Sequence, residues 1–335
     1  MSNITLKTLA KRTGFSVTTV SRALKDGSEI NVNTKKKVME AASVLNYHPN
    51  LYAYRLKMGK TFQICFFLNQ LDDITNYEKQ IIKGIFKSLN NSNYELIVKP
   101  IFRSNQVEAI KEVVEKKLAD GVIISHTTLN DERVKFLIEK NFPFVTHGRT
   151  ELFSEHPYFD NDHAEFINES LTYLKEKKCE EIILIKPANK FTYNYISTKA
   201  FDKKISEINL KKNTKPEFSH EDSLEELKNK IIEKFSKKNN VKGIISGSDV
   251  RTLVIISTLQ ELGYTINKDV FIVSKSYSTA PNYFFPKIPY FHEDMELTGY
   301  KLGDFLLKRI AGSKINELQH VEKNKFIKND EFVNS

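Results

Sequence analysis

The chain has little cysteine, with only Cys65 and Cys179 among 335 residues. These two lie far apart, in or beside apolar runs and without a C-x-x-C partner, so we expect buried free thiols rather than a disulfide or a metal site. No apolar run approaches the roughly 18 residues that would span a membrane. Residues 1–4 show no basic segment followed by an apolar one, as a secretory signal would require. We therefore expect a cytoplasmic protein that does not contact membranes.

Catalytic motifs are also missing. There is no glycine-rich phosphate loop, no H-E-x-x-H and no G-x-S-x-G, because residues 243–247 have the wrong glycine spacing. The acids and histidines of residues 155–163 can be drawn as a metal site, but Asp162 is more simply a helix N-cap. Glu293 and Asp294 likewise suit the start of a helix. We expect neither an enzyme nor a cofactor, and a product formed from sugars or sugar phosphates in a turnover assay would contradict this.

Positive charge is concentrated at one end of the chain. Residues 1–60 contain 11 Lys and Arg but three Asp and Glu, for a net charge of +8, whereas the other 275 residues carry +1. A small basic module on a nearly neutral body is typical of a nucleic-acid binder. From charge alone, a solvated basic surface with no partner is the alternative. A sugar-transport receptor is disfavoured by this module and by the missing secretory signal.

Three short helical patterns follow one another in the basic segment. The first covers about 5–12, the second begins at Ser16, and the third begins near residues 33–34. Around Gly14 there is room for a tight turn only. Two short helices joined by such a turn and closed by a third predict a helix-turn-helix domain.

The second helix has an outer face that its small core does not require. Val17, Thr18, Ser21 and Arg22 lie away from the apolar stripe. Small and hydroxylated side chains near a helix start can approach bases and phosphates, and Arg22 can donate two hydrogen bonds to a guanine. The alternative is the polar outside of an ordinary amphipathic helix.

These residues resemble the LacI/GalR family of bacterial repressors. The most specific matches are Thr19-Val20-Ser21-Arg22 and Asn46-Tyr47-His48-Pro49-Asn50, with the spacing between them. The resemblance extends over residues 4–10, 14–24, 34–38, 45–50 and 59–61. It implies that Val17, Thr18 and Arg22 read bases in the major groove.

The same resemblance implies further DNA contacts. Phosphate contacts that set the register are expected from Thr5, Ser16, Thr19, Ser21, Asn31, Thr34, Tyr47 and Asn50. Leu6 and Ala53 belong to the same DNA-binding set. Residues 50–58 would form a hinge helix that orders only on DNA, with Leu56 as an apolar wedge in the minor groove. Read without the resemblance, this segment is a linker with an apolar side. Tyr54 stands where the family often has Arg, which weakens the expected minor-groove contacts.

The rest of the chain alternates strand-like and helical patterns. Strands are predicted at 62–68, 94–101, 121–125, 142–147, 181–186, 242–246 and 270–275. Alternating strands and helices favour parallel sheets covered by helices on both faces. The length suggests two doubly wound halves, which bind ligands at the carboxyl ends of their strands.

This part is similar to the family's effector domain, which is periplasmic-binding-protein-like and has two lobes. The fold class is thus an all-α helix-turn-helix DNA-binding domain followed by an α/β effector domain. The expected boundaries are 1–46 for the DNA-binding domain, 47–61 for the hinge helix and linker, and 62–335 for the effector-binding and dimerisation domain. Lobe 1 would take about 62–159 and 288–320, and lobe 2 about 160–287 and 321–335.

A sugar site at the cleft follows from the resemblance. The expected effector-binding residues are Tyr77, Ser125, Arg149, Phe191, Ser197, Asp249 and Lys275. Charged groups and amides bind paired hydroxyls, and aromatic faces cover the apolar side of a sugar. Many members have Arg at the place of Ser197 and an acidic pair at the place of Ser276-Tyr277, so the effector's identity stays open. The Arg149 and Lys275 pattern resembles members that respond to α-glucosides or galactosides.

The expected assembly is a homodimer on a pseudo-palindromic operator, one helix-turn-helix per half-site. Residues 317–335 contain no leucine heptads, so a coiled-coil tetramerisation tail is not expected. Most such proteins are repressors that an inducer releases. We therefore expect a repressor of carbohydrate-utilisation genes. The sequence leaves open whether the effector releases the protein from DNA or promotes its binding.

Overall fold

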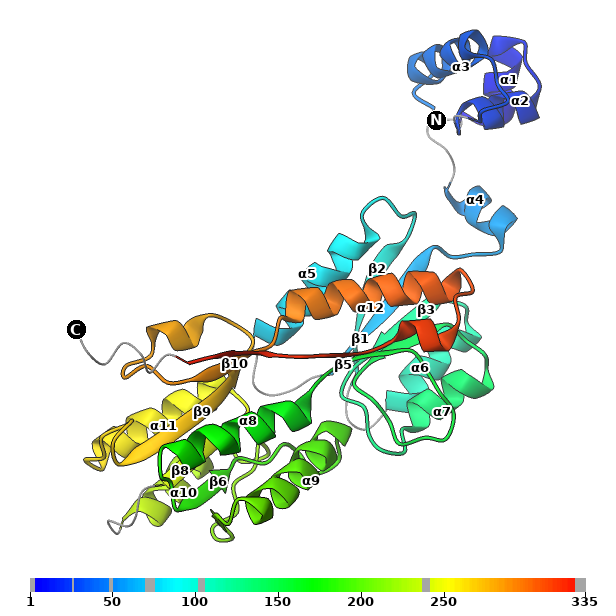
Figure 1. Cartoon of the computed structure of the whole chain (residues 1–335). Helices are drawn as coiled ribbons and strands as arrows, with labels where there is room; N and C mark the ends of the chain where they lie inside the picture. Colours follow the sequence, from blue (N-terminus) through cyan, green and yellow to red (C-terminus); the bar gives the residue numbers. More distant parts are fainter. Residues whose placement is uncertain are drawn as a thin grey trace. The chain divides into compact units, whose positions relative to one another are not determined.

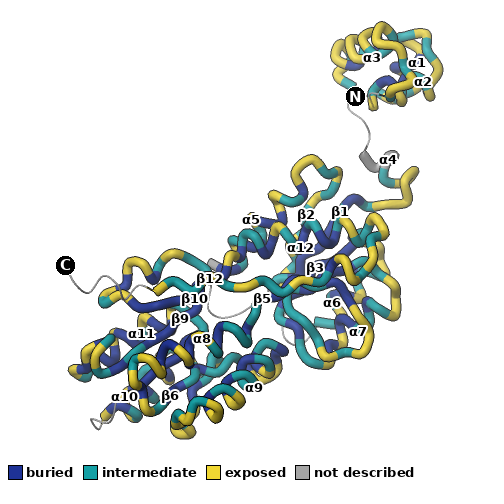
Figure 2. The backbone as a smooth tube through the Cα atoms, in the orientation of Figure 1, coloured by how far each residue is buried: buried dark blue, intermediate teal, exposed yellow. Residues whose placement is uncertain are grey.

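A computed structural model describes residues 4–25, 27–47, 51–69, 76–101, 106–236 and 242–328. The chain divides into two compact units, residues 1–62 and 63–335. The colours of Figure 1 follow the chain through both units, and Figure 2 shows where each residue is buried.

The first unit is a helix-turn-helix domain. Its helices are α1 (Leu6–Thr13), α2 (Val17–Ala23) and α3 (Val32–Val44), followed by α4 (Leu51–Met58). Leu9, Val20 and Val38 are fully buried between the first three helices. Gly14 ends α1 with a φ of 73°, a left-handed conformation that costs glycine little and makes the tight turn into α2.

The second unit contains two six-stranded sheets. The first sheet has the order β11-β5-β4-β3-β1-β2 and the second β12-β10-β9-β8-β6-β7. All neighbours in the first sheet are parallel. In the second sheet only β12 runs antiparallel, beside β10. The first sheet's strands are β1 (Gln63–Asn69), β2 (Glu95–Ile101), β3 (Gly121–Ile124), β4 (Phe144–His147), β5 (Tyr158–Asn161) and β11 (Gln319–Glu322). The second sheet's strands are β6 (Glu181–Leu184), β7 (Lys211–Lys212), β8 (Lys242–Ser246), β9 (Val270–Ser276), β10 (Tyr290–His292) and β12 (Lys325–Ile327).

Helices cover both faces of each sheet (Figure 1). Lobe 1, built on the first sheet, has α5 (Asn76–Leu89) and α12 (Met295–Ile310) on one face, with α6 (Gln106–Glu115) and α7 (Glu132–Glu139) on the other. Lobe 2, built on the second, has α8 (His163–Glu176) and α9 (Thr192–Glu207) on one face, with α10 (Leu224–Phe235) and α11 (Asp249–Glu261) on the other. Two 3-10 turns, η1 (Ala280–Tyr283) and η2 (Ile315–Leu318), complete the unit. The resulting layers of apolar side chains explain the dark strands in Figure 2.

The chain passes between the lobes three times. The first crossing joins β5 to α8, the second joins β10 to α12, and the third joins β11 to β12. The second lies a few residues beyond the expected position near 288, because β10 still pairs with β9 in lobe 2. Asp162 accepts a hydrogen bond from the Glu165 amide, and Asp294 one from the Leu297 amide. Both acids therefore cap helices at crossings, as their sequence positions predicted.

Two glycines let α5 and α12 approach closely. A Cβ atom on Gly299 would lie 2.1 Å from the Ile81 carbonyl oxygen, and one on Gly84 would lie 2.0 Å from that of Glu296. We expect Gly299→Ala to lower the free energy of unfolding by about 1–3 kcal/mol, because the helices must move apart despite the better helix propensity of Ala. Urea denaturation measures this loss. Lys308→Ala, at an exposed position of α12, is the control, and an equal effect of both would contradict the close approach.

Candidate functional site

The outer face of α2 carries the predicted base-reading residues. Val17 and Thr18 are exposed, and Val17 leaves 41% of an apolar side chain open to solvent. Arg22 is also exposed, with its Nε 3.6 Å from a carboxylate oxygen of Glu29. Ser21 is half-buried. The arrangement leaves a short face free to enter a major groove.

Several predicted phosphate contacts lie at helix starts. Thr5 accepts from the Thr8 amide at 3.3 Å, Ser16 from the Thr19 amide at 3.0 Å, and Asn31 from the Asn33 amide at 2.8 Å. Their oxygens cap helix N-termini, where the backbone also favours a phosphate. The Thr19 hydroxyl is 2.8 Å from that of Ser16. These residues thus have structural roles as well as the predicted ones.

The remaining predicted DNA contacts differ in exposure. Leu6 and Tyr47 pack against the core of the first unit, and Thr34 is half-buried. Burial raises the pKa of the Tyr47 hydroxyl. Leu56, in α4, is 85% exposed, as a side chain that inserts into DNA must be. Asn50 and the side chain of Ala53 lie outside the described residues.

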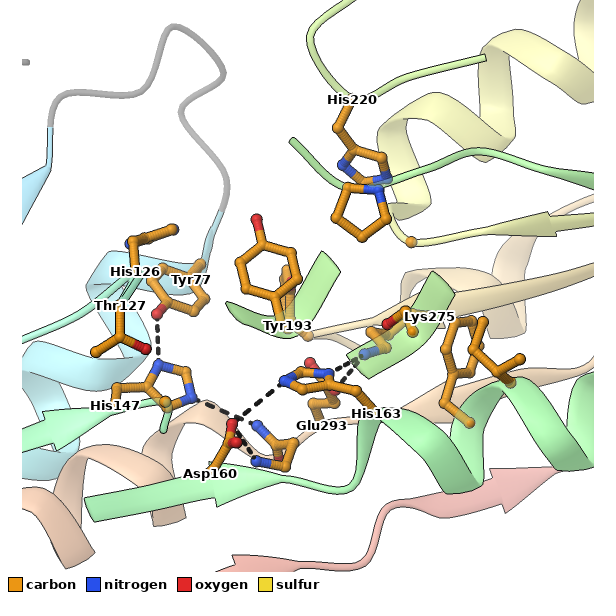
Figure 3. A pocket seen from close by; sticks show the side chains of 18 of the residues that line it. Tyr77, His126, Thr127, His147, Asp160, His163, Tyr193, His220, Lys275 and Glu293 are labelled. Atoms are coloured by element: carbon orange, nitrogen blue, oxygen red, sulfur yellow. Dashed lines mark hydrogen bonds and ion pairs between the residues drawn. The ribbon is translucent and has the colours of Figure 1, made fainter. Parts of the chain in front are cut away.

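The second unit encloses a cavity of about 100 Å³ between its lobes (Figure 3). Four of the seven predicted effector-binding residues line it: Tyr77, Arg149, Ser197 and Lys275. They come from the start of α5, the loop after β4, α9 and β9. The structure therefore brings residues from both lobes to one site, at the carboxyl ends of parallel strands.

Three predicted residues lie behind this lining. The Ser125 hydroxyl is 3.1 Å from Nδ1 of His126, and the Phe191 ring packs on the rings of His126 and Tyr193. Asp249 accepts hydrogen bonds from the hydroxyls of Ser276 and Ser278. These side chains support lining residues or loops instead of facing the cavity.

Sequence reasoning missed most of the lining. The polar and aromatic residues it did not name as effector contacts are His126, Thr127, His147, Asp160, Asn161, His163, Tyr193, His220 and Glu293, whereas Tyr277 stands at the place of the family's acidic pair. The place of a residue just after a predicted strand could have indicated a position at the cavity. His126 follows the predicted strand at 121–125, and Tyr277 follows the one at 270–275. His220 follows no predicted strand, and nothing in the local pattern distinguished it.

A continuous series of charged and polar side chains lies at the cavity, and Figure 3 shows its middle part from Asp160 through His163 and Lys275 to Glu293. We call it the polar chain, and its members in order are Arg149, Asp160, His163, Lys275, Glu293 and Asn324. The successive distances are 2.7 Å from Arg149 Nε to Asp160 Oδ2, 3.2 Å from Asp160 Oδ1 to His163 Nε2, and 3.1 Å from His163 Nδ1 to Lys275 Nζ. Lys275 Nζ then lies 2.7 Å from Glu293 Oε1, to which Asn324 donates at 3.3 Å.

The polar chain engages both ring nitrogens of its histidine. The Lys275 ammonium can only donate, so His163 Nδ1 accepts, and its Nε2–H donates to Asp160. The Asp160 carboxylate, next to His163 and Arg149, has a pKa well below its usual range despite its burial. Each crossing contributes a member, because Asp160, Glu293 and Asn324 lie at or beside the first, second and third crossing.

A pair of buried arginines holds two histidines at the cavity. Arg133, paired with Asp131 at 2.7 Å, donates to the His126 carbonyl at 3.0 Å in lobe 1. In lobe 2, Arg251 donates to the His220 carbonyl at 2.8 Å. Burial is the largest cause that lowers the pKa of both imidazoles to about 3, and neighbouring positive charges add to it.

The two lobes touch across the cavity. The Thr192 amide donates to the Thr127 carbonyl at 2.9 Å, and the adjacent Thr128 and Phe191 form an antiparallel bridge. Gln80 of lobe 1 donates to the Tyr277 carbonyl of lobe 2 at 2.6 Å. These contacts close the cleft, and a change in the angle between the lobes must break them.

The described ranges also bear on two other kinds of site. They contain no helix long and apolar enough to cross a membrane. Within the same ranges, no three His, Cys, Asp or Glu side chains are placed to hold a metal ion. Asp160 and His163 of the metal-like sequence cluster belong to the polar chain, and Cys65 and Cys179 are buried free thiols.

A helix-turn-helix unit followed by a two-lobed domain with a polar cleft defines the class of DNA-binding transcriptional regulators. Residues 5–50 match the family model of bacterial regulatory proteins of the lacI family, and residues 171–328 match the periplasmic binding protein-like domain. The HTH-type transcriptional regulator RegA of Clostridium saccharobutylicum is 26% identical over 98% of this chain and 99% of its own. The chain therefore has a LacI-family helix-turn-helix domain and a periplasmic-binding-protein-like domain, and the relatives it resembles are transcriptional regulators, not enzymes.

Solved structures show the same fold. A lac repressor dimer bound to operator and the anti-inducer ONPF has a TM-score of 0.81, with 19% identity over 98% of both chains. The complex of the transcriptional regulator CelR with cellobiose has a TM-score of 0.71, with 18% identity over 97% of this chain and 98% of the other. The expected fold class, a helix-turn-helix domain with a two-lobed α/β domain, is confirmed.

Proposed function

We propose that the protein represses carbohydrate-utilisation genes and that a small sugar in the cleft controls its affinity for operator DNA. The observation that carries this is the cavity between the lobes, lined by hydrogen-bonding groups and aromatic rings together. Hydroxyls need such donors and acceptors, and the apolar face of a sugar packs on aromatic rings. The CelR structure holds cellobiose, and α-glucosides or galactosides remain the preferred candidates here.

The control would act through the crossings. An effector in the cavity contacts the polar chain, whose members lie at all three crossings, so it favours one arrangement of the lobes. That preference would change the hinge segment at α4 and thereby DNA affinity, a coupling of typically about 1–3 kcal/mol. The effector can either release the protein from DNA or promote its binding, and we favour release by an inducer.

The DNA-bound form would be a homodimer, like the lac repressor dimer on its operator. Lobe 2 exposes an apolar patch suited to such a contact. Tyr283 and Phe285 are 85% and 86% exposed, and Val250 and Leu253 of α11 are also open to solvent. The hydrogen bond from Ser278 to Asp249 holds the two segments together. Exposed apolar patches of this kind mark protein interfaces.

Sequencing genomic fragments retained by the purified protein tests this function. We expect one palindromic site beside carbohydrate transport or hydrolase genes. The candidate sugars that those genes suggest are then added, and release of the fragment identifies the inducer. Retention of unenriched fragments in a salt-sensitive way, with every candidate sugar present or absent, would leave only non-specific binding and contradict the proposal.

Arg22→Ala is expected to weaken operator binding by about 1–3 kcal/mol and to relax specificity at one base pair. Arg22→Lys keeps the charge but loses the two-pronged contact to guanine, so it should lose the specificity as well. Binding to operators changed at single base pairs measures both effects. Lys228→Ala, in an exposed ion pair of the effector domain, is the control. Unchanged affinity of Arg22→Ala for the preferred site would show that α2 is not the reading helix.

A further inference from the structure

The charged side chains that line the cavity balance one another. Arg149 is paired with Asp160, and Lys275 is paired with Glu293, so the four carry no net charge. Asp160, Lys275 and Glu293 are buried, with side chains at most 8% exposed. A ligand carboxylate or phosphate would have to displace one of these carboxylates or remain without a counter-charge. Either change is costly at a buried site.

The histidines of the lining do not supply the missing positive charge. Both ring nitrogens of His163 are already engaged, Nδ1 with Lys275 and Nε2 with Asp160. At neutral pH His126 and His220 are uncharged, since burial lowers their pKa to about 3, and burial also lowers the pKa of His147. Their ring nitrogens can still exchange neutral hydrogen bonds with a ligand.

Lobe 2 contributes a ring nitrogen of His220 to this side of the cavity. Nε2 of His220 is buried and has no hydrogen-bond partner among the described residues. Gly247 makes room for this ring, because a Cβ atom there would lie 2.8 Å from Nε2. Figure 3 shows the Tyr193 hydroxyl pointing into the space between His126 and His220. A buried group without a partner is costly, so a ligand hydroxyl that meets His220 gains affinity.

Building on the proposed function, we propose that the cleft takes an uncharged polyhydroxy compound, that its charge balance excludes sugar acids and sugar phosphates, and that His220 is a specificity-determining residue. The relevant contrast is between compounds of the same ring that differ in charge. The His220 imidazole meets a hydroxyl from lobe 2, while Arg149 and Lys275 keep their own carboxylate partners.

Calorimetry on the full chain tests the ligand class with matched probes. D-glucose, D-galactose, their methyl α-glycosides, their uronates, their 6-phosphates, maltose and lactose are titrated, and operator release is measured in parallel. We expect at least one neutral probe to bind, at least 100-fold more tightly than the uronates and the 6-phosphates. A uronate or phosphate that binds equally well or better overturns the inference but leaves a sugar-controlled regulator. If no probe binds or alters operator affinity, the sugar effector itself is contradicted.

A change of charge tests the reason for the exclusion. Glu293→Gln leaves Lys275 without its carboxylate and gives the lining a net positive charge. The ratio of neutral-sugar to uronate affinity is expected to fall at least tenfold, because the ligand carboxylate can now pair with Lys275. Glu261→Gln, in the exposed pair with Lys228, should leave the ratio unchanged. An unchanged ratio in a folded Glu293→Gln protein would overturn the proposed role of the charge balance.

His220 is tested separately, so that the inference does not depend on the fold of one variant. His220→Phe removes the ring nitrogens and is expected to weaken the neutral sugar at least tenfold. His220→Gln keeps a neutral donor and acceptor and should recover part of the affinity. Equal affinities of His220→Phe and the unaltered protein would show that this residue makes no contact with the ligand.

Discussion

Lowering the pH from 7 to 5 is expected to destabilise the effector domain by several kcal/mol. The pKa of His126 and His220 is lowered from 6.5 to about 3, and that of His156 to about 4, with burial as the largest cause. Below pH 6.5 the unfolded chain binds protons that the folded chain does not. Stability is therefore complete above pH 6.5 and is lost as the pH falls toward 4, by about 1.4 kcal/mol per pH unit for each histidine.

Urea denaturation at several pH values measures this loss. His156 lies outside the cavity, 3.1 Å from the Thr146 hydroxyl, and His156→Gln can keep that hydrogen bond. The variant should therefore reduce the pH dependence by less than one third, because burial also lowers the pKa of His147, and should not change the ligand site. Lys308→Ala, which removes no histidine, should keep the full dependence. A stability that stays constant between pH 7 and pH 5 would mean that these imidazoles are not held neutral.

Lys275→Met is expected to lower the free energy of unfolding by about 3–5 kcal/mol. The side chain of Glu293, only 3% exposed, would keep its charge without the ammonium that now lies 2.7 Å away. His163 would also lose the donor to its Nδ1. A buried charge without its partner is far more costly than the loss of an exposed pair.

A second substitution separates the pair from its parts. Lys275→Met combined with Glu293→Leu removes both charges, and we expect it to recover most of the stability. Lys228→Met in the exposed pair with Glu261, where the two atoms are 3.1 Å apart, should cost less than about 1 kcal/mol. Urea denaturation of the four proteins gives the comparison. A loss below 1 kcal/mol for Lys275→Met alone would show that water reaches Glu293 in the folded state.

The parts of the fold that local patterns specify could be predicted. Capped amphipathic helices made the helix-turn-helix visible, since Ser16 begins α2 and Val20 and Ala23 face its core. All seven predicted strands correspond to strands of the structure, because a strand buried on both faces is a continuous apolar run. The short strands β5, β7, β10, β11 and β12 were not predicted. They contain two to four residues, and their pairing with neighbours defines them more than their own composition.

Less of the site than of the fold could be predicted from the sequence. Tyr77, Arg149 and Lys275 could be expected there because they stand in loops or strand ends of a resembling family, and the cavity does include them. The polar chain could not be expected, because it joins Asp160 to Lys275 across more than a hundred residues. No local periodicity reports such contacts. The buried His220, which packs against Gly247, has the same long-range origin.

The three crossings also have a consequence for how the protein is made. Lobe 1 starts at β1 but takes α12 and β11 from near the end of the chain, and lobe 2 takes β12 from after them. On the ribosome, the sheet of lobe 1 must therefore wait, with one face covered by α5 alone, until almost all of lobe 2 has been synthesised. The first unit needs only residues 1–62 and can fold early. A chain that stops before α12 would consequently carry a complete helix-turn-helix domain and no finished sensor to control it.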